Sequence, residues 1–193
     1  MAHIHIQVGG SSGHVARHIA ENHPNLKFIV QDKPAVEHAF HADIPAELTQ
    51  SGRLRFQPHD FLQPQEVMAD VYLVKSVLHD WPDAYAIQIL RNLIRALEKS
   101  KLANKDSSPR ILLVDMVLAP EYDENGKPIS PLHIRRTVAS MDLMLFAQCN
   151  ARDRKMQDWL DIVDKADKRL VMAKVYALPP APMTVMELKL RDG

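Results

Sequence analysis

The sequence has a single cysteine, Cys149, and no excess of charge of either sign. One cysteine excludes an internal disulfide and a cysteine-based zinc site, and it fits a reducing compartment. Lys plus Arg and Asp plus Glu both total 24, so nothing indicates a nucleic-acid partner or an anionic membrane surface. The chain also lacks an apolar run near the ~20 residues of a membrane span and a basic-then-apolar signal. We therefore expect a cytoplasmic protein.

Metal-site patterns are also missing. The ten histidines are scattered along the chain and form no recognisable ligand set, so we expect no metal. What is present is ordinary for a globular protein: 46% of the 193 residues are hydrophobic and 25% are charged. We expect one domain over residues 1–193. Its first strand begins within about four residues of Met1, so the chain is expected to start directly at a catalytic core.

Strand and helix patterns alternate along the chain. Apolar runs predict strands at 4–8, 27–31, 54–58, 70–76, 110–117, 170–178 and 184–190. Helical periodicity covers 15–22, 34–40, 84–97, 132–148 and 153–166, with a polar linker at 99–109 and a long exposed loop at 119–131. The prolines at 179–182 predict a turn between the last two strands. This order predicts an α/β fold: a Rossmann-like, doubly wound, mostly parallel sheet with a C-terminal antiparallel hairpin.

The loop after the first strand carries Gly9, Gly10 and Gly13. Glycines at a strand-to-helix turn let the backbone approach a ligand, and the following helix directs unpaired N–H groups at the same place. Asp32 stands about twenty residues later, where an acid at a strand end can bind ribose hydroxyls. The pattern indicates an adenosine-containing ligand. Ser11 replaces the second glycine of the dinucleotide fingerprint, which disfavours a pyrophosphate ligand.

Two polar residues stand next to or within apolar strands. His79 follows the strand 70–76, and a lone histidine there is most often structural, but open α/β sheets bind their ligands at this edge. Asp80 and Asp83 fit equally well as caps of the following helix. Asp115 lies within the strand 110–117, where packing alone does not explain it because burying an unpaired carboxylate is costly.

Six motifs together resemble one enzyme family: VGGSSGH, FIVQDKP, HDF, VKSVLHDWPD, ILLVDMVLAP and SMDLMLFAQCNARDRKMQDW. They are similar to the S-adenosylmethionine-dependent O-methyltransferases of plant and fungal secondary metabolism, and closer to the fungal branch. The likeness runs from Ile4 to Leu190. It implies methyl transfer from S-adenosylmethionine, with S-adenosylhomocysteine as product, to a hydroxyl of a small aromatic or polyketide-like molecule, a phenolic hydroxyl being the expected one.

The resemblance also implies residue roles. The loop 9–13 matches the motif around the methionine part of the cofactor, and Asp32 matches the acid that binds the ribose. The residues implied to contact adenine or the rest of the cofactor are Asp60, Phe61 and Lys75. His79 matches the catalytic base and Asp115 the carboxylate that holds it. The residues implied to contact the acceptor are Asp80, Trp81, Met141, Met144 and Asn150. The apolar stripe with Met141, Met144 and Phe146 also reads as plain core, and both interpretations stay open.

The sequence departs from the family at several positions. Gln7 stands where the family often has an acid, and Ser11 and Ser12 replace part of a more Gly-rich loop. Met156 occupies the place of a second catalytic carboxylate, so base catalysis would rest on His79 and Asp115 alone. The family's N-terminal helical domain, which builds its dimer and closes part of the pocket, is expected to be missing here, so the dimer that the family implies is not carried over with the other features.

Two rival hypotheses follow. One is a degenerate S-adenosylmethionine-binding protein that no longer transfers methyl groups, or that catalyses a different rearrangement; Met156 and the missing domain motivate it. The other is a nicotinamide-dependent oxidoreductase. The loop spacing and the lack of a Tyr-x-x-x-Lys pair count against this second hypothesis.

Overall fold

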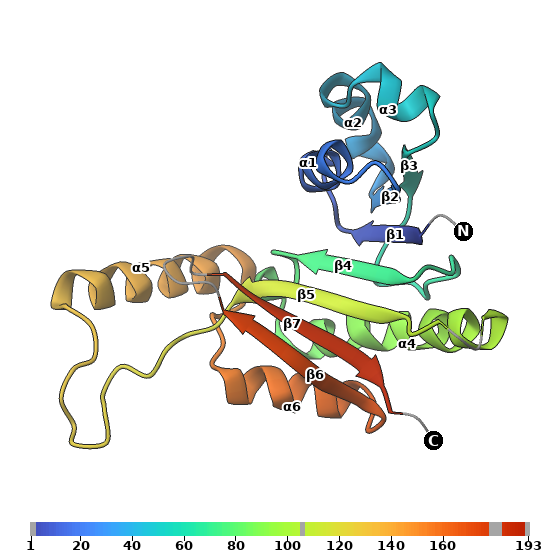
Figure 1. The fold of residues 1–193 in the computed structure, drawn as a ribbon. Coiled ribbons are helices and arrows are strands. Elements are labelled where there is room, and N and C mark those ends of the chain that lie inside the picture. Colours follow the sequence, from blue (N-terminus) through green and yellow to red (C-terminus); the bar gives the residue numbers. More distant parts are fainter. Residues whose placement is uncertain (1–2, 105–106, 178–182, 192–193) are drawn as a thin grey trace.

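The computed structural model describes residues 3–104, 107–177 and 183–191, and within these ranges seven strands form one sheet (Figure 1). The strands are β1 (His3–Val8), β2 (Leu26–Asp32), β3 (Leu54–Pro58), β4 (Val71–Lys75), β5 (Arg110–Met116), β6 (Leu170–Ala177) and β7 (Met183–Leu190). Their order is β3-β2-β1-β4-β5-β7-β6. Pairs among β1 to β5 are parallel, whereas β7 runs antiparallel to both β5 and β6. The predicted fold class is confirmed. The proline turn predicted at 179–182 lies outside the described residues.

Helices connect the parallel strands. They are α1 (His14–Asn22), α2 (Glu37–Asp43), α3 (Ala46–Gln50), α4 (Asp83–Ala103), α5 (Leu132–Cys149) and α6 (Met156–Ala166), with 3-10 turns η1 (Pro34–Val36) and η2 (Leu78–Asp80). The helix expected over 34–40 is thus a 3-10 turn that passes into α2. The sequence did not predict α3, because five residues are too few to show a helical period.

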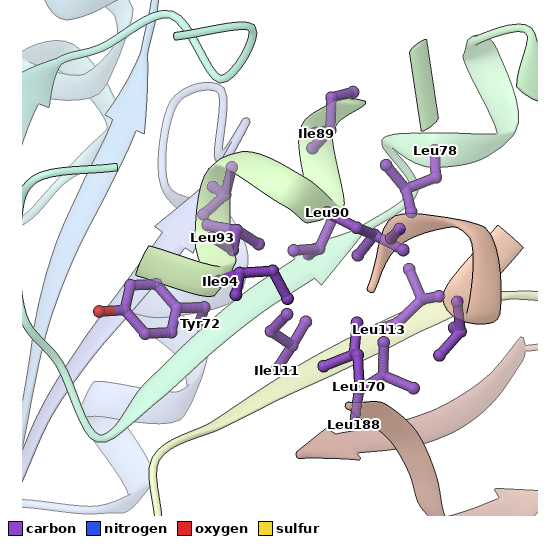
Figure 2. Packing of buried hydrophobic residues seen from close by; sticks show 14 of the residues in the cluster. Tyr72, Leu78, Ile89, Leu90, Leu93, Ile94, Ile111, Leu113, Leu170 and Leu188 are labelled. Carbon is purple, nitrogen blue, oxygen red and sulfur yellow. The ribbon is translucent and has the colours of Figure 1, made fainter. Parts of the chain in front are cut away.

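The sheet is covered on both faces, as parallel strands require. Successive residues of β2 point to opposite sides, so Ile29 joins one apolar cluster while Phe28 and Val30 join another. The first cluster lies between the sheet and α4 and α6, and the second includes residues of α1, α2 and α3. Figure 2 shows α4 contributing Leu90 and Leu93 to the first cluster. These two layers hold the strand ends in fixed relative positions.

The polar linker predicted at 99–109 is wrong over its first residues, because α4 continues to Ala103. Ser100 explains the difference. It is buried, its hydroxyl donates to the carbonyl of Ala96 at 2.8 Å, and it accepts the N–H of Ala69 at 3.2 Å. A polar residue that looks like linker in the sequence therefore anchors the helix.

Two details of α6 also differ from expectation. The helix begins at Met156 rather than at residue 153, because the Asp158 carboxylate accepts the backbone N–H of Lys155 at 2.9 Å and caps the helix there. Trp159 and Val163 are buried as predicted, whereas Leu160 is 39% exposed. The buried stripe is Trp159, Ile162, Val163 and Ala166, and Leu160 lies beside that stripe.

Helix α5 matches its predicted bounds but not the plain-core interpretation. None of its residues is buried. In Figure 1 it extends along the edge of the molecule, beyond the layer formed by α4 and α6. Its apolar residues, Met141, Met144 and Phe146 among them, are 41%, 50% and 62% exposed. Over the described residues, no helix is both long and apolar enough to cross a membrane.

Candidate active site

The glycine loop after β1 lies at the carboxyl ends of the parallel strands, and hydrogen bonds fix it against β2. The Asp32 carboxylate accepts the backbone N–H of Ser11 at 2.8 Å and that of Lys33 at 2.7 Å. The Gly10 N–H donates to the carbonyl of Gln31 at 3.0 Å. Asp32 is thereby held at the loop, and each of its oxygens keeps further acceptor capacity for ligand hydroxyls.

Gly9 shows why this loop needs glycine. Its φ is +63°, and a Cβ placed there would lie 2.9 Å from Cγ2 of Val77 and 3.4 Å from the ring of Phe61. The backbone at Gly9 thus touches two other predicted site segments directly. Packing and the left-handed backbone therefore both require glycine at this position. This loop, residues 9–13, is the glycine cradle.

Gln7, one of the departures from the family, has a structural role. It is 3% exposed, and its Oε1 accepts the N–H of Ala16 in the first turn of α1 at 3.1 Å. It therefore satisfies an otherwise unpaired helix N–H from inside the sheet. No pattern in the sequence indicated this cap, which comes from a strand residue nine positions earlier.

The loop after β3 carries Asp60 and Phe61, and α4 holds it in place. Asn92 donates from Nδ2 to the carbonyl of Phe61 at 3.0 Å, and the Asp60 carboxylate accepts the N–H of Leu62 at 2.9 Å. The Phe61 ring meets Trp81 edge to face, with 5.6 Å between centroids. The structure thus brings Phe61 to Gly9 and to Trp81, as a shared ligand site would require.

Lys75 is the last residue of β4. In the sheet register Val8 pairs with Val74, so Lys75 lies one residue beyond that pair, beside the start of the glycine loop. Its Nζ donates to the Ser76 hydroxyl at 3.3 Å. Both residues belong to the edge of the sheet that also carries Gly9.

His79 lies in η2, directly after β4. The preceding Leu78 is fully buried among the α4 side chains (Figure 2), which fixes the turn on the core. Nδ1 of His79 is 3.6 Å from Oδ1 of Asp115, and Nε2 is 3.5 Å from Oδ1 of Asp80. The imidazole is 24% exposed and so lies between a buried carboxylate and a half-exposed one.

Asp115 of β5 is fully buried. Its Oδ1 accepts the N–H of Met116 at 2.9 Å, while Oδ2 has no hydrogen-bond partner among the described residues. Burial raises the pKa of the Asp115 carboxyl, whereas His79 and the Met116 N–H act in the opposite direction. A buried carboxylate with spare acceptor capacity stabilises an imidazolium that forms beside it.

A further buried carboxylate, Asp153, lies in the segment between α5 and α6. Asp153 is 4% exposed, and within the described part of the chain neither of its oxygens has a partner. Burial and the neighbouring Asp142 raise the pKa of Asp153, and His79 lowers it, so the two groups are close enough to interact. Met156 begins α6 and packs on the core instead. The carboxylates that pair with the His79 imidazole among the described residues are Asp80 and Asp115. That base catalysis rests on His79 and Asp115 stays a prediction.

The acceptor residues predicted on α5 are not gathered into a cavity. A groove of about 490 Å³ lies between residues 116–121 and the first half of α5, and Met116 and Asp142 line it. Met141 and Met144 are half exposed and are not among its lining residues. Asn150 ends α5 with a left-handed backbone conformation. Nor do the described residues include a group of three side chains able to hold a metal ion.

The glycine cradle, the acid that holds it and a histidine between carboxylates lie at one edge of the sheet. This arrangement is typical of nucleotide-binding α/β proteins. Comparison with known proteins makes the class specific. Residues 3–167 match the family model described as an O-methyltransferase domain. The chain belongs to this family, which confirms the resemblance inferred from the motifs.

Individual relatives agree with the family. The chain is 36% identical over 191 residues to the O-methyltransferase pgmB of Aspergillus terreus, covering 96% of this chain and 49% of that protein. Among solved structures, a LepI complex with S-adenosylmethionine superposes with a TM-score of 0.76 at 25% identity, covering 98% of this chain and 43% of LepI. The structure of OxaC in complex with S-adenosylhomocysteine and oxaline superposes with a TM-score of 0.74 at 29% identity. The match covers 97% of this chain and 42% of OxaC. The chain thus spans about half the length of the relatives it matches.

Proposed function

We propose that residues 1–193 act as one catalytic domain that binds S-adenosylmethionine and methylates a hydroxyl, phenolic in our hypothesis, on a small aromatic or polyketide-like molecule. The observation that carries the proposal is the position of the His79–Asp115 pair, which shares one edge of the sheet with the glycine cradle and Asp32. Membership of the O-methyltransferase family supports it. The same membership does not favour a nicotinamide-dependent oxidoreductase.

The residues present fit the cofactor. The backbone of loop 9–13 would approach its methionine part, the Asp32 carboxylate its ribose hydroxyls, and Asp60, Phe61 and Lys75 the remainder. When bound, S-adenosylmethionine supplies an electrophilic methyl group and leaves as S-adenosylhomocysteine. The Asp32 carboxylate keeps acceptor capacity beyond its bonds to the N–H groups of Ser11 and Lys33, which supports a ligand with hydroxyl groups at this loop.

His79 would take the proton of the acceptor hydroxyl. A phenol with pKa near ~10 and an imidazole near ~6.5 make full deprotonation before attack unfavourable by ~5 kcal/mol, so the proton transfers as the oxygen attacks. Asp115 near Nδ1 is buried, whereas Asp80 near Nε2 is half exposed and screened by solvent, so a proton on Nδ1 is favoured and Nε2 is the acceptor atom. Asp115 and Asp153, both buried, then stabilise the imidazolium.

The acceptor molecule would lie next to Nε2 of His79, on the side of the imidazole away from Asp115. We propose that Asp80 and Trp81 contact it, since they flank the imidazole, and that Met141, Met144 and Asn150 of α5 contact it when this helix is covered. The groove between residues 116–121 and α5 is mainly apolar and leads from Met116, the neighbour of Asp115. A flat aromatic molecule matches such a lining.

Calorimetric titration with S-adenosylhomocysteine, with NAD as control ligand, tests the cofactor part. We expect binding of the first ligand only, and weaker binding to Asp32→Ala. Equal affinity in that variant would contradict the ribose assignment. Binding of neither ligand by the unmodified chain would contradict the proposal as a whole.

A methyl-transfer assay over a panel of phenols tests the base. His79→Ala should lower kcat by about 10² to 10⁴ with S-adenosylhomocysteine affinity retained, because the group removed acts in proton transfer only. His41→Ala, which removes a 60% exposed imidazole on α2, is the matched control and should stay fully active. Unchanged turnover in His79→Ala would remove this residue from the mechanism. Cofactor binding without any methyl transfer by the unmodified chain would favour the degenerate binding protein.

A further inference from the structure

Arg154 is a buried cation for which the proposed chemistry has no use. Its side chain is 0% exposed, and it is among the largest fully buried residues of the described chain. Burying a guanidinium is unfavourable unless it is both paired and hydrogen-bonded. The contacts that compensate for its burial therefore indicate what the residue does.

Those contacts converge on the turn that carries His79. Nη1 of Arg154 donates to the carbonyl of Leu78 at 2.7 Å, and Nη2 donates to the carbonyl of Trp81 at 2.6 Å. These two carbonyls stand on either side of His79 and Asp80. One planar guanidinium thus holds both ends of η2, which a single-point donor such as lysine cannot reproduce.

The turn depends on this contact because its own hydrogen bonds are long. Within η2 the N–H of Asp80 reaches the carbonyl of Val77 at 3.2 Å, and that of Trp81 reaches Leu78 at 3.2 Å. Three-residue 3-10 turns have poor hydrogen-bond geometry, whereas bonds from a charged donor are shorter and about twice as strong. The guanidinium is the stronger constraint on where the imidazole lies.

Arg154 is itself fixed to the strand that carries Asp115. Its carbonyl accepts the N–H of Leu118 at 2.9 Å, just beyond β5. Its guanidinium lies 4.9 Å from the centre of the Trp159 ring, and the indole N–H donates to the carbonyl of Met116 at 3.2 Å. Arg154 therefore connects the end of β5 with η2, the two elements whose spacing sets the distance from His79 to Asp115.

We propose that Arg154 is a positioning residue for catalysis: by holding the carbonyls of Leu78 and Trp81 from the end of β5, it keeps the His79 imidazole against Asp115. The inference rests on the proposed function, since it assigns Arg154 a role in the proton transfer by His79. Asp83 completes the arrangement, because its Oδ1 accepts from Nε of Arg154 at 3.0 Å and so orients the guanidinium.

The test compares Arg154→Lys with Arg152→Met. Arg152 lies two residues earlier and is half exposed, and its ion pairs among the described residues go to the same Asp83, at 3.4 Å, and to Asp158, at 2.9 Å. In Arg154→Lys we expect kcat to fall by about ten- to a hundredfold, because a displacement on the order of 1 Å already has an effect of this size. The affinity for S-adenosylhomocysteine should change less than about twofold, since the hydrogen bonds of the Arg154 side chain go to Leu78, Trp81 and Asp83 and not to the glycine loop. Arg152→Met should keep full kcat.

A second measurement separates positioning from stability alone. The imidazole carbon and nitrogen NMR signals of His79 in the S-adenosylhomocysteine complex, assigned with His79→Gln, should move in Arg154→Lys and stay in place in Arg152→Met. If Arg154→Lys does not fold, Asp83→Asn, which removes the orienting charge but keeps the guanidinium, should show the same loss of kcat and the same signal change.

The outcomes distinguish the two proposals. Normal kcat and an unchanged His79 signal in folded Arg154→Lys would overturn the positioning role, while leaving the methyltransferase proposal intact. If the unmodified chain transfers no methyl group to any acceptor, the proposed function fails, and the role of Arg154 in that reaction fails with it. If the His79 signals still move in Arg154→Lys in that case, they would show that Arg154 positions η2, independently of turnover.

Discussion

At the scale of single residues, the site is organised by buried charges that lack full compensation. Asp115 has one carboxylate oxygen without a partner, and Asp153 has two, among the described residues. Buried carboxylates without hydrogen-bond partners reduce the free energy of unfolding. Because these two lie near the candidate active site, we infer that they are explained by chemistry rather than by stability.

Asp115→Asn should therefore be more stable than the unmodified protein at neutral pH, although its activity falls. Burial raises the pKa of this carboxyl above its ordinary value of 3.8. Between that value and the raised one, the folded state binds more protons than the unfolded state. The free energy of unfolding thus decreases as pH rises through this window, and the asparagine variant lacks this decrease.

Urea unfolding at a series of pH values from 4 upward measures the effect. The difference in unfolding free energy between Asp115→Asn and the unmodified protein should increase with pH and then become constant. Parallel pH profiles for the two proteins would show that Asp115 has no raised pKa. His79→Ala in both backgrounds controls for the neighbouring imidazole, which lowers the carboxyl pKa.

At the scale of elements, the glycine loop joins β1, the loop after β3 and the approach to η2. A methyl group at Gly9 would meet Val77 and Phe61, and its φ of +63° is unfavourable for any side chain. Gly52 has nearly the same φ of +66° but nothing within 4 Å of a built Cβ. Comparing alanine substitutions at Gly9 and Gly52 therefore separates the effect of backbone strain from the effect of crowding by neighbouring side chains.

Gly52→Ala should lower the free energy of unfolding by about 1–2 kcal/mol, the contribution of a left-handed backbone alone. Gly9→Ala should lower it further and also weaken binding of S-adenosylhomocysteine, because Val77 and Phe61 must shift. Denaturant unfolding and calorimetric titration of both variants test this. An equal stability loss in the two, with cofactor affinity retained in Gly9→Ala, would contradict the close approach.

At the scale of the whole molecule, stability is distributed unevenly. Helix α4 buries eight residues against the sheet, whereas α5, nearly as long, buries none. Local opening requires little free energy where few apolar contacts are broken. The helix expected to border the acceptor is thus the one least fixed by the rest of the chain.

Backbone amides of α5 should exchange with deuterium at least about tenfold faster than those of α4, since local rather than global opening exposes them. Mass spectrometry of peptides from residues 83–103 and 132–149 measures this. Equal protection of the two helices would contradict the expectation and show that another surface covers α5 in solution. Dilution of the protein is the control, because it removes protection that arises from self-association.

Sequence patterns predicted the succession of strands and helices along the chain and the glycine loop with Asp32. They also placed His79 after one strand and Asp115 within another. These features depend on periodicity and on turn residues, which are local along the chain. Parallel strands necessarily bring their carboxyl ends to one edge, so the meeting of these residues could be predicted. Motif resemblance added the family, which the comparisons confirmed.

Three other features could not be predicted from local patterns. Arg154 donates to the His79 turn across 76 positions, Gln7 caps a helix, and the apolar α5 has no buried residue. Such contacts depend on how whole elements pack, and the same short sequence would form a helix start or a core stripe elsewhere. Local preferences specify elements, whereas the assembled layers determine which polar groups they bury together.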